Sequence, residues 1–206
     1  MAYFTTSFKR LMIFTVAFVI LLNTFTSVKA DDTIEENAAN IDLLWMLICA
    51  VLVFMMQAGF MCLESGIIRN KNNINVALKN VSDFGISIVC YWIIGYGLMF
   101  GSSKSGFVGF DDFFFDPSGT ETSGQAMTFF IFQSMFCATA ASIISGAVAE
   151  RLKFNSYLVI TAIVGTVLYP VVGHWGWANS DDMFGGDGST GWLYNLGFTD
   201  FAGSTI

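Results

Sequence analysis

Four long apolar stretches, separated by shorter polar connections, dominate the pattern of hydrophobic positions along this chain. They cover residues 43–63, 84–100, 126–149 and 157–178. A helix needs about 20 apolar residues to cross a hydrocarbon core roughly 30 Å thick, and each stretch is close to that length. A further apolar segment begins at residue 198 and runs to Ile206. We therefore expect an all-α, polytopic helical membrane protein with four transmembrane helices and the start of a fifth.

The first 30 residues have the three parts of a secretory signal peptide. Lys9 and Arg10 precede an apolar run over residues 11–22, and small residues suited to cleavage surround the end of the segment at Ala30. The apolar run is shorter than the 18 or more residues usual for a span. We expect cleavage after Ala30, with the membrane domain in residues 31–206. An uncleaved first helix is the alternative.

Composition and charge support a membrane protein. Hydrophobic residues make up 54% of the chain and charged residues only 12%, whereas soluble domains carry about 25% charged residues. The net charge of -7 excludes a basic nucleic-acid-binding protein. Basic residues follow the first and third stretches, and acidic residues follow the second and fourth. By the positive-inside rule, the basic connections are cytoplasmic.

Little in the sequence indicates catalysis or a metal site. The four cysteines all lie within apolar stretches, and no CxxC pair or His/Cys cluster is present. The chain contains no phosphate-binding loop, dinucleotide fingerprint or nucleophile elbow. We therefore expect no enzyme, no cofactor and no metal ion.

Charged side chains within the spans need partners. Lys79 and Asp83 are four residues apart at the inner end of the second span, and we expect them to pair with each other or with Glu64. A proton-relay function for Glu64 is the alternative. Asp200 stands at the opening of the last apolar segment, and an ionisable group entering a span marks a functional site by default.

Several aromatic residues have both an ordinary and a functional interpretation. Phe132 and Phe136 are four apart and share one face of the third span, which fits core packing as well as a site. Trp175 and Trp177 stand at the outer end of the fourth span, where an interfacial belt is common. His174 beside them has no second ligand nearby, so we expect a hydrogen-bonded histidine rather than a metal ligand.

Taken together, the motifs resemble the ammonium transporter (Amt/MEP/Rh) family, and its Amt branch more than the Rhesus glycoproteins. The resemblance runs in order from about Ile41 to the last residue. It rests on MQAGFMCLESG (56–66), RNKN (69–72), LKNV (78–81), YWIIGYG (91–97), FQSMF (132–136), SGAVAER (145–151), YPVVGHW (169–175) and DFAGST (200–205).

The resemblance implies a fold and a set of site residues. Family members are homotrimers whose subunits each have a pore through 11 helices, built from two inverted five-helix halves and a final helix. Phe136 matches the outer phenylalanine gate, with Phe132 one turn before it. Trp177 matches the tryptophan that, with the gate, binds ammonium at an outer vestibule, and Asp200 matches the aspartate just below. Because residues 180–188 lengthen the outer loop, Trp175 is the alternate candidate and Trp192 a more remote one.

The resemblance also implies a function and its limits. We expect transport of ammonium or methylammonium across a plasma membrane or bacterial inner membrane. The first pore histidine of the family would fall two residues after Ile206, so the chain corresponds to a domain truncated at the start of its fifth helix, and we expect it not to conduct alone. The alternative is a nontransporting membrane module, such as an ammonium sensor or a trimer-interfering truncated product.

Overall fold

The computed structural model describes residues 34–118, 123–178 and 191–206, with side chains from residue 37 onward. The chain divides into two compact units, residues 1–41 and 42–206. The described part of the first unit is the start of helix α2 (Ile34–Ile67), and the second unit holds the rest of the bundle. The predicted signal peptide, residues 1–30, lies outside the described residues.

The four predicted spans are confirmed as helices long and apolar enough to cross a membrane. The first is α2, and the second joins α3 (Asn73–Cys90), the π-helical turn η2 (Tyr91–Gly95) and α4 (Tyr96–Phe100). The third is α5 (Ser123–Ala147), and the fourth joins α6 (Phe154–Ile163), the π-helical turn η3 (Val164–Leu168) and α7 (Tyr169–Trp177). The helices α2 and α3 begin at Ile34 and Asn73, before the apolar stretches, because their first turns also contain polar residues.

The start of a fifth helix is not seen in residues 198–206, which are irregular around a turn at Phe201 and Ala202. Gly203 has a φ of +68°, in the left-handed region, and its N–H donates to the carbonyl of Asp200 over 3.1 Å. Asp, Gly and Ser favour turns because they tolerate unusual backbone angles or bond to their own backbone. The short helix α8 (Trp192–Asn195) precedes this segment.

The second and fourth spans cross closely at their π-helical turns. A Cβ atom on Gly95 would lie 2.5 Å from the backbone oxygen of Gly165, and one on Gly165 would lie 3.2 Å from the backbone of Ser87. Small residues allow membrane helices to approach in this way. The close approach brings the tyrosines of the two spans together: the rings of Tyr91 and Tyr169 have centroids 6.2 Å apart.

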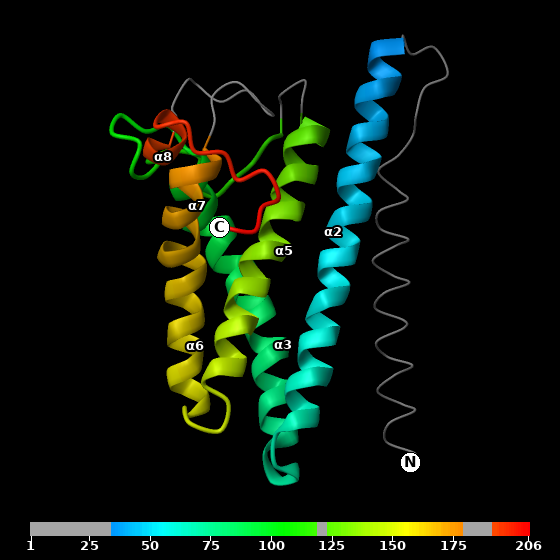
Figure 1. Cartoon of the computed structure of the whole chain (residues 1–206), viewed down its shortest axis with the longest axis vertical. Coiled ribbons are helices and arrows are strands. Elements are labelled where there is room, and N and C mark those ends of the chain that lie inside the picture. The colour runs from blue at the N-terminus through cyan, green and yellow to red at the C-terminus, as the bar shows by residue number, and fades with distance from the viewer. Residues whose placement is uncertain (1–33, 119–122, 179–190) are drawn as a thin grey trace. The chain divides into compact units, whose positions relative to one another are not determined.

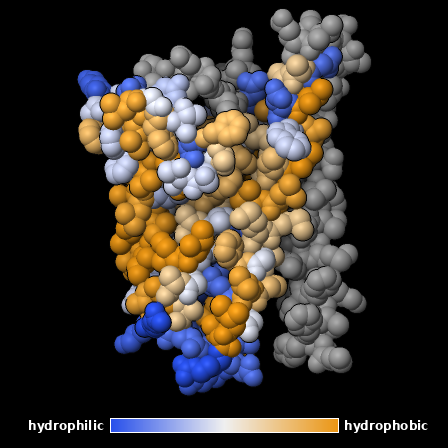
Figure 2. Space-filling view, viewed as in Figure 1, coloured by the Kyte–Doolittle hydropathy of each residue, from blue (hydrophilic) through white to orange (hydrophobic). Residues whose placement is uncertain are grey.

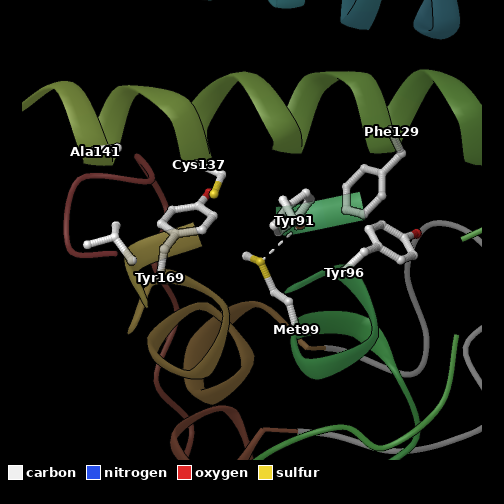
Figure 3. Close-up of a cluster of buried hydrophobic side chains, with 8 residues drawn as sticks. Tyr91, Tyr96, Met99, Phe129, Cys137, Ala141 and Tyr169 are labelled. Atoms are coloured by element: carbon white, nitrogen blue, oxygen red, sulfur yellow. Dashed lines mark hydrogen bonds between the residues drawn. The ribbon is translucent and has the colours of Figure 1, made fainter. Parts of the chain in front are cut away.

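An aromatic core fills the space between these spans and α5 (Figure 3). Tyr91 is fully buried, and its hydroxyl donates to the sulfur of Met99 over 3.2 Å. Tyr96 packs beside it, edge to face, with ring centroids 6.0 Å apart. Phe136 and Trp177 pack against this core from its margin, half-buried. The core therefore supports two of the residues that the sequence selected.

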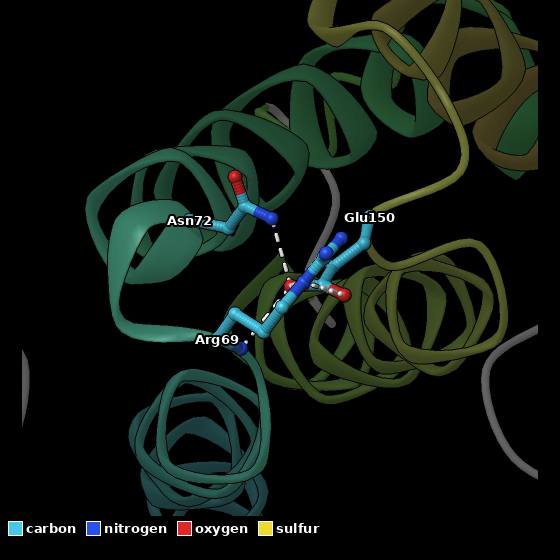
Figure 4. Close-up of polar contacts among 3 residues, drawn as sticks. All are labelled: Arg69, Asn72 and Glu150. Atoms are coloured by element: carbon cyan, nitrogen blue, oxygen red, sulfur yellow. Dashed lines mark hydrogen bonds and ion pairs between the residues drawn. The ribbon is translucent and has the colours of Figure 1, made fainter.

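A polar contact joins the α2–α3 and α5–α6 connections at one end of the bundle (Figure 4). The Glu150 carboxylate accepts from the Arg69 guanidinium over 3.1 Å and from the Asn72 amide over 2.7 Å. These hydrogen bonds, that of Arg69 first, lower the pKa of Glu150 to about 2. Glu150 itself has a φ of +61°, a strained conformation for a residue other than glycine.

The surface agrees with a membrane-embedded bundle. Figure 2 shows apolar residues over the middle of the viewed face and hydrophilic residues gathered at its lower end, where Figure 1 places the two connections joined by Glu150. These connections carry Arg69, Lys71, Arg151 and Lys153, so this is the end that the positive-inside rule predicts to be cytoplasmic. Trp177, at the other end of the fourth span, is then on the outer side.

Gly95 and Gly85 lie on the same span but in opposite surroundings, which makes them a matched pair. Gly95→Ala forces a Cβ against the Gly165 carbonyl, and overpacking of this kind costs about 1–3 kcal/mol. Gly85 has nothing within 4 Å of the added atom, so Gly85→Ala should be neutral or stabilise the helix by up to about 1 kcal/mol. Denaturant unfolding in detergent micelles measures both. Equal stability of the two variants would contradict the close crossing.

Candidate functional site

Trp177 and Asp200 meet at the outer end of the bundle. Trp177 is the last residue of α7, and Asp200 lies in the turn segment that follows α8. The indole N–H of Trp177 donates to Asp200 Oδ2 over 3.2 Å. The sequence separates the two residues by 23 positions, and the structure brings them into direct contact. The edge of an indole ring and a carboxylate are therefore held together.

Asp200 is anchored by backbone donors as well. The N–H of Thr205 donates to Oδ1 and that of Ile206 to Oδ2, each over 3.1 Å. Burial raises the pKa of Asp200, but the hydrogen bonds from Thr205, Ile206 and Trp177 outweigh it, and the net pKa lies below its ordinary value. The carboxylate is thus ionised at neutral pH. These donors hold the carboxylate in a fixed position beside Trp177.

Phe132 and Phe136 do share one face of α5. Their ring centroids are 4.9 Å apart at an interplanar angle of 84°, and both side chains are half-buried. Phe136 packs against the same aromatic core as Trp177. An edge-to-face pair of this geometry is a stable arrangement that fixes both rings. The structure therefore gives the two residues a defined mutual orientation.

Trp175 and Trp192 have a different environment from Trp177. The indole N–H of Trp175 donates to the carbonyl of Phe107 over 3.0 Å. The ring of Trp192 stacks on Phe107 with centroids 5.8 Å apart, and it contacts Trp175 at 5.9 Å. These two tryptophans tie α7 and α8 to the outer loop, whereas Trp177 contacts the carboxylate. The long loop at residues 180–188, which raised the question of the alternate tryptophan, lies outside the described residues.

His174 on α7 is fully buried against α4. Its Nδ1 lies 2.8 Å from the carbonyl oxygen of Met99, and Nε2 has no partner within the described structure. Because a carbonyl can only accept, Nδ1 carries the hydrogen of this bond. The expectation of a hydrogen-bonded histidine is confirmed. The bond fixes the last turn of α7, one turn before Trp177.

The expected ion pair of Lys79 is wrong. Its ammonium group donates to the carbonyl of Leu152 over 2.9 Å and lies 5.4 Å from the ring centroid of Tyr157. Leu152 lies in the connection between α5 and α6, so a loop carbonyl offers Lys79 an acceptor that spacing along α3 does not reveal. Asp83 instead accepts from the hydroxyl of Tyr157. Sequence reasoning did not select Tyr157, because a tyrosine at the start of a span looks like an ordinary interfacial residue.

The chain is similar to known proteins over most of its length. The model of the Ammonium Transporter Family matches residues 44–206. The chain is 53% identical over 167 residues to sll0537 of Synechocystis sp., a protein provisionally named an ammonium transporter. The match covers 81% of this chain and 30% of that relative. It is 38% identical over 200 residues to the ammonium transporter Amt2 of Archaeoglobus fulgidus, covering 93% of this chain and 41% of the relative.

Solved structures give the same result for the fold. A structure titled Sensor Amt Protein superposes with a TM-score of 0.73 at 43% identity, over 81% of this chain and 40% of that chain. Mep2 of Saccharomyces cerevisiae superposes with a TM-score of 0.64 at 24% identity, over 78% of this chain and 35% of that chain. The chain thus spans well under half the length of the relatives it matches.

Proposed function

Since the chain belongs to the ammonium transporter family, we propose that it forms the first part of a pathway for ammonium across a membrane, with Trp177 and Asp200 as the outer recruitment site. The observation that carries this proposal is the hydrogen bond of the Trp177 indole to the ionised Asp200 carboxylate. The arrangement is chemically suited to a small cation. It offers a negative ring face and a negative charge on one side of the bundle.

Magnitudes decide what this site can do. Bringing a monovalent cation to the middle of a bilayer costs at least about 3 kcal/mol. One aromatic face returns up to about 2 kcal/mol when the contact is desolvated. The Trp177 ring can therefore concentrate ammonium but cannot carry the ion through the membrane, and Asp200 supplies further electrostatic stabilisation. Loss of a proton from the ion, or polar groups deeper in the pathway, must supply the rest.

We assign Phe132 and Phe136 to a gate below the recruitment site. Both rings are half-buried, and Phe136 shares the aromatic core with Trp177. An apolar ring pair admits a neutral molecule at lower cost than a charged one, because a charge loses its hydration there. In this proposal the gate separates recruitment of ammonium from passage of the transported species.

The chain matches only part of the length of its transporter relatives. It spans 30% and 41% of two transporter relatives. In transporters built from inverted repeats, substrate sites lie where the halves meet. We therefore propose that residues 31–206 do not conduct by themselves and that conduction belongs to the pore of a homotrimer in a plasma membrane or bacterial inner membrane. Signal-peptide cleavage after Ala30 is part of the same proposal.

Ammonium sensing is the second candidate function. The solved structure at 43% identity is titled a sensor Amt protein, and a recruitment site of the kind described here serves a sensor as well as a transporter. The two functions differ in one measurement. A sensor binds ammonium at the outer side but does not take up labelled methylammonium, whereas a transporter binds the ion and also takes it up.

Trp177 should matter more than the neighbouring outer tryptophans. In the complete gene product, Trp177→Leu should weaken the apparent affinity for methylammonium by roughly tenfold, because a desolvated cation–π contact is worth about 1–2 kcal/mol. Trp192→Leu is the matched control, since Trp192 stacks on Phe107 in the outer loop. Concentration-dependent uptake, corrected for membrane abundance, measures both. A larger loss of affinity for the Trp192 variant would show that Trp177 is not the recruiting tryptophan.

Asp200 should contribute charge and not only a turn-capping hydrogen bond. A side-chain cap is worth about 1 kcal/mol and asparagine serves nearly as well. Asp200→Asn should therefore leave membrane abundance and trimer assembly intact while abolishing most uptake of labelled methylammonium. Asp200→Glu should recover only part, because the longer side chain moves the charge away from Trp177. Near-normal uptake by the asparagine variant would reduce Asp200 to a cap.

A further inference from the structure

The connection from α4 to α5 turns back along the second span before it reaches α5. The N–H of Gly109 donates to the carbonyl of Leu98, and the N–H of Phe114 donates to the carbonyl of Ile93, each over 3.0 Å. Later residues of the connection thus contact earlier residues of the span. Residues 109–114 therefore run antiparallel to the outer part of the second span, from its end toward its interior.

Helix geometry gives the depth that this segment reaches. A carbonyl in an α-helix is level with the N–H group four residues later, so the N–H of Phe114 is about level with Gly97. Gly97 is three residues before the end of α4 at Phe100, which is about 5 Å inside the span. A Cβ atom on Gly97 would lie 2.9 Å from the ring of Phe113. The connection therefore lies directly against the last turn of α4.

The third span places the segment at a similar level. The ring of Phe115 stacks on that of Phe130, with centroids 5.2 Å apart and an interplanar angle of 22°. Phe130 lies about 10 Å along α5, which begins at Ser123. Tyr96 of the second span contacts both rings, with centroid distances of 4.1 and 5.5 Å. The segment thus lies inside the outer ends of both helices.

On the side that faces the spans, the backbone of the segment has protein partners. The N–H of Phe114 is bonded to Ile93, and the carbonyl of Phe115 accepts from the indole N–H of Trp92 over 2.9 Å. The Leu98 carbonyl, which has no partner within its helix because α4 ends, is taken by the connection. Irregular backbone at membrane depth is tolerated only where protein satisfies it. Residues 113–115 meet this condition.

The other side of the segment is apolar and exposed within the described structure. The side chains of Phe113 and Phe114 are 42% and 58% exposed. Phe114 contacts Trp92 edge to face, with centroids 5.8 Å apart, and Trp92 is itself 41% exposed. An exposed apolar row continues from Trp92 along one face of α3 at spacings of three or four residues. It consists of Leu78, Val81, Gly85 and Val89.

We propose that Phe113 and Phe114 are immersed in the outer leaflet of the lipid bilayer, so that this connection is a membrane anchor and not a loop in water. Two observations favour lipid over a protein partner. The phenylalanines continue the apolar row of a span whose length matches the bilayer. Asp112 and Asp116 on either side are exposed. A protein that covered the phenylalanines would also desolvate these carboxylates at a cost, whereas the membrane boundary leaves them in water.

Spin labelling of the complete gene product in lipid vesicles, with its native cysteines replaced, measures this depth. A nitroxide on Phe114→Cys should collide more often with oxygen, which partitions into hydrocarbon, than with a water-soluble nickel chelate. Val89→Cys on the apolar row and Ser105→Cys in the same connection are the matched controls, since both positions are exposed. The ratio of oxygen to nickel collisions at position 114 should approach that at 89 and exceed that at 105 several-fold.

Two results would overturn the anchor. A ratio at position 114 like that at 105 would place the segment in water. Few collisions with either reagent at position 114 would show that a second copy of the chain or another part of the protein covers it. Neither result depends on ammonium recruitment at Trp177 and Asp200, because the anchor is a separate feature of the structure.

A second measurement keeps an aromatic side chain at the position, because a nitroxide is itself apolar. In Phe114→Trp, the emission added to that of the unsubstituted protein should be quenched by lipids brominated on their acyl chains and not by iodide in water. Ser105→Trp is the matched control and should show the reverse. Quenching of the Phe114→Trp emission by iodide, or by neither reagent, would contradict immersion in the outer leaflet.

Discussion

A polar group buried in this bundle can find a hydrogen-bond partner only inside the protein, because the hydrocarbon core of a membrane offers none. That constraint explains why polar side chains from separate helices converge. The Gln57 amide donates to Thr139 on α5 over 2.8 Å and its oxygen accepts from Ser142, so one side chain of α2 is bonded twice to the third span. Glu64 connects α2 to both α3 and α5 in the same way. These contacts fix which helix faces meet, a choice that apolar packing in lipid makes only weakly.

The need for internal partners also distinguishes the inner end of the bundle from the outer end. At the inner end, Gln57 and Glu64 are bonded to side chains of neighbouring helices and are buried. At the outer end, Asp200 takes its hydrogen bonds from the backbone of a turn and from Trp177, and it remains half-exposed. A carboxylate held by fixed donors keeps its charge and its position without being enclosed. That combination suits a group that meets a cation arriving from water.

The spans could be predicted from the sequence because length and apolarity are almost sufficient conditions for a membrane helix. The contact of Trp177 with Asp200 could be anticipated only through family resemblance, since no local pattern relates residues 23 positions apart. The pairing of Lys79 could not be predicted. Spacing of four residues makes Lys79 and Asp83 neighbours on α3, but Lys79 bonds the Leu152 carbonyl in the α5–α6 connection and Asp83 bonds the Tyr157 hydroxyl on α6. Only tertiary structure decides between a neighbour on the same helix and a partner on another.

The two π-helical turns connect the crossing of the spans to the site. A π-helical turn widens the helix by one residue per turn and is often found near functional positions. Here η2 and η3 lie against each other at Gly95 and Gly165. Beyond this crossing, α4 and α7 continue toward the outer end, where His174 on α7 bonds the Met99 carbonyl on α4. The two spans that approach closely at these glycines are thus bonded again one turn before Trp177, whose indole contacts Asp200.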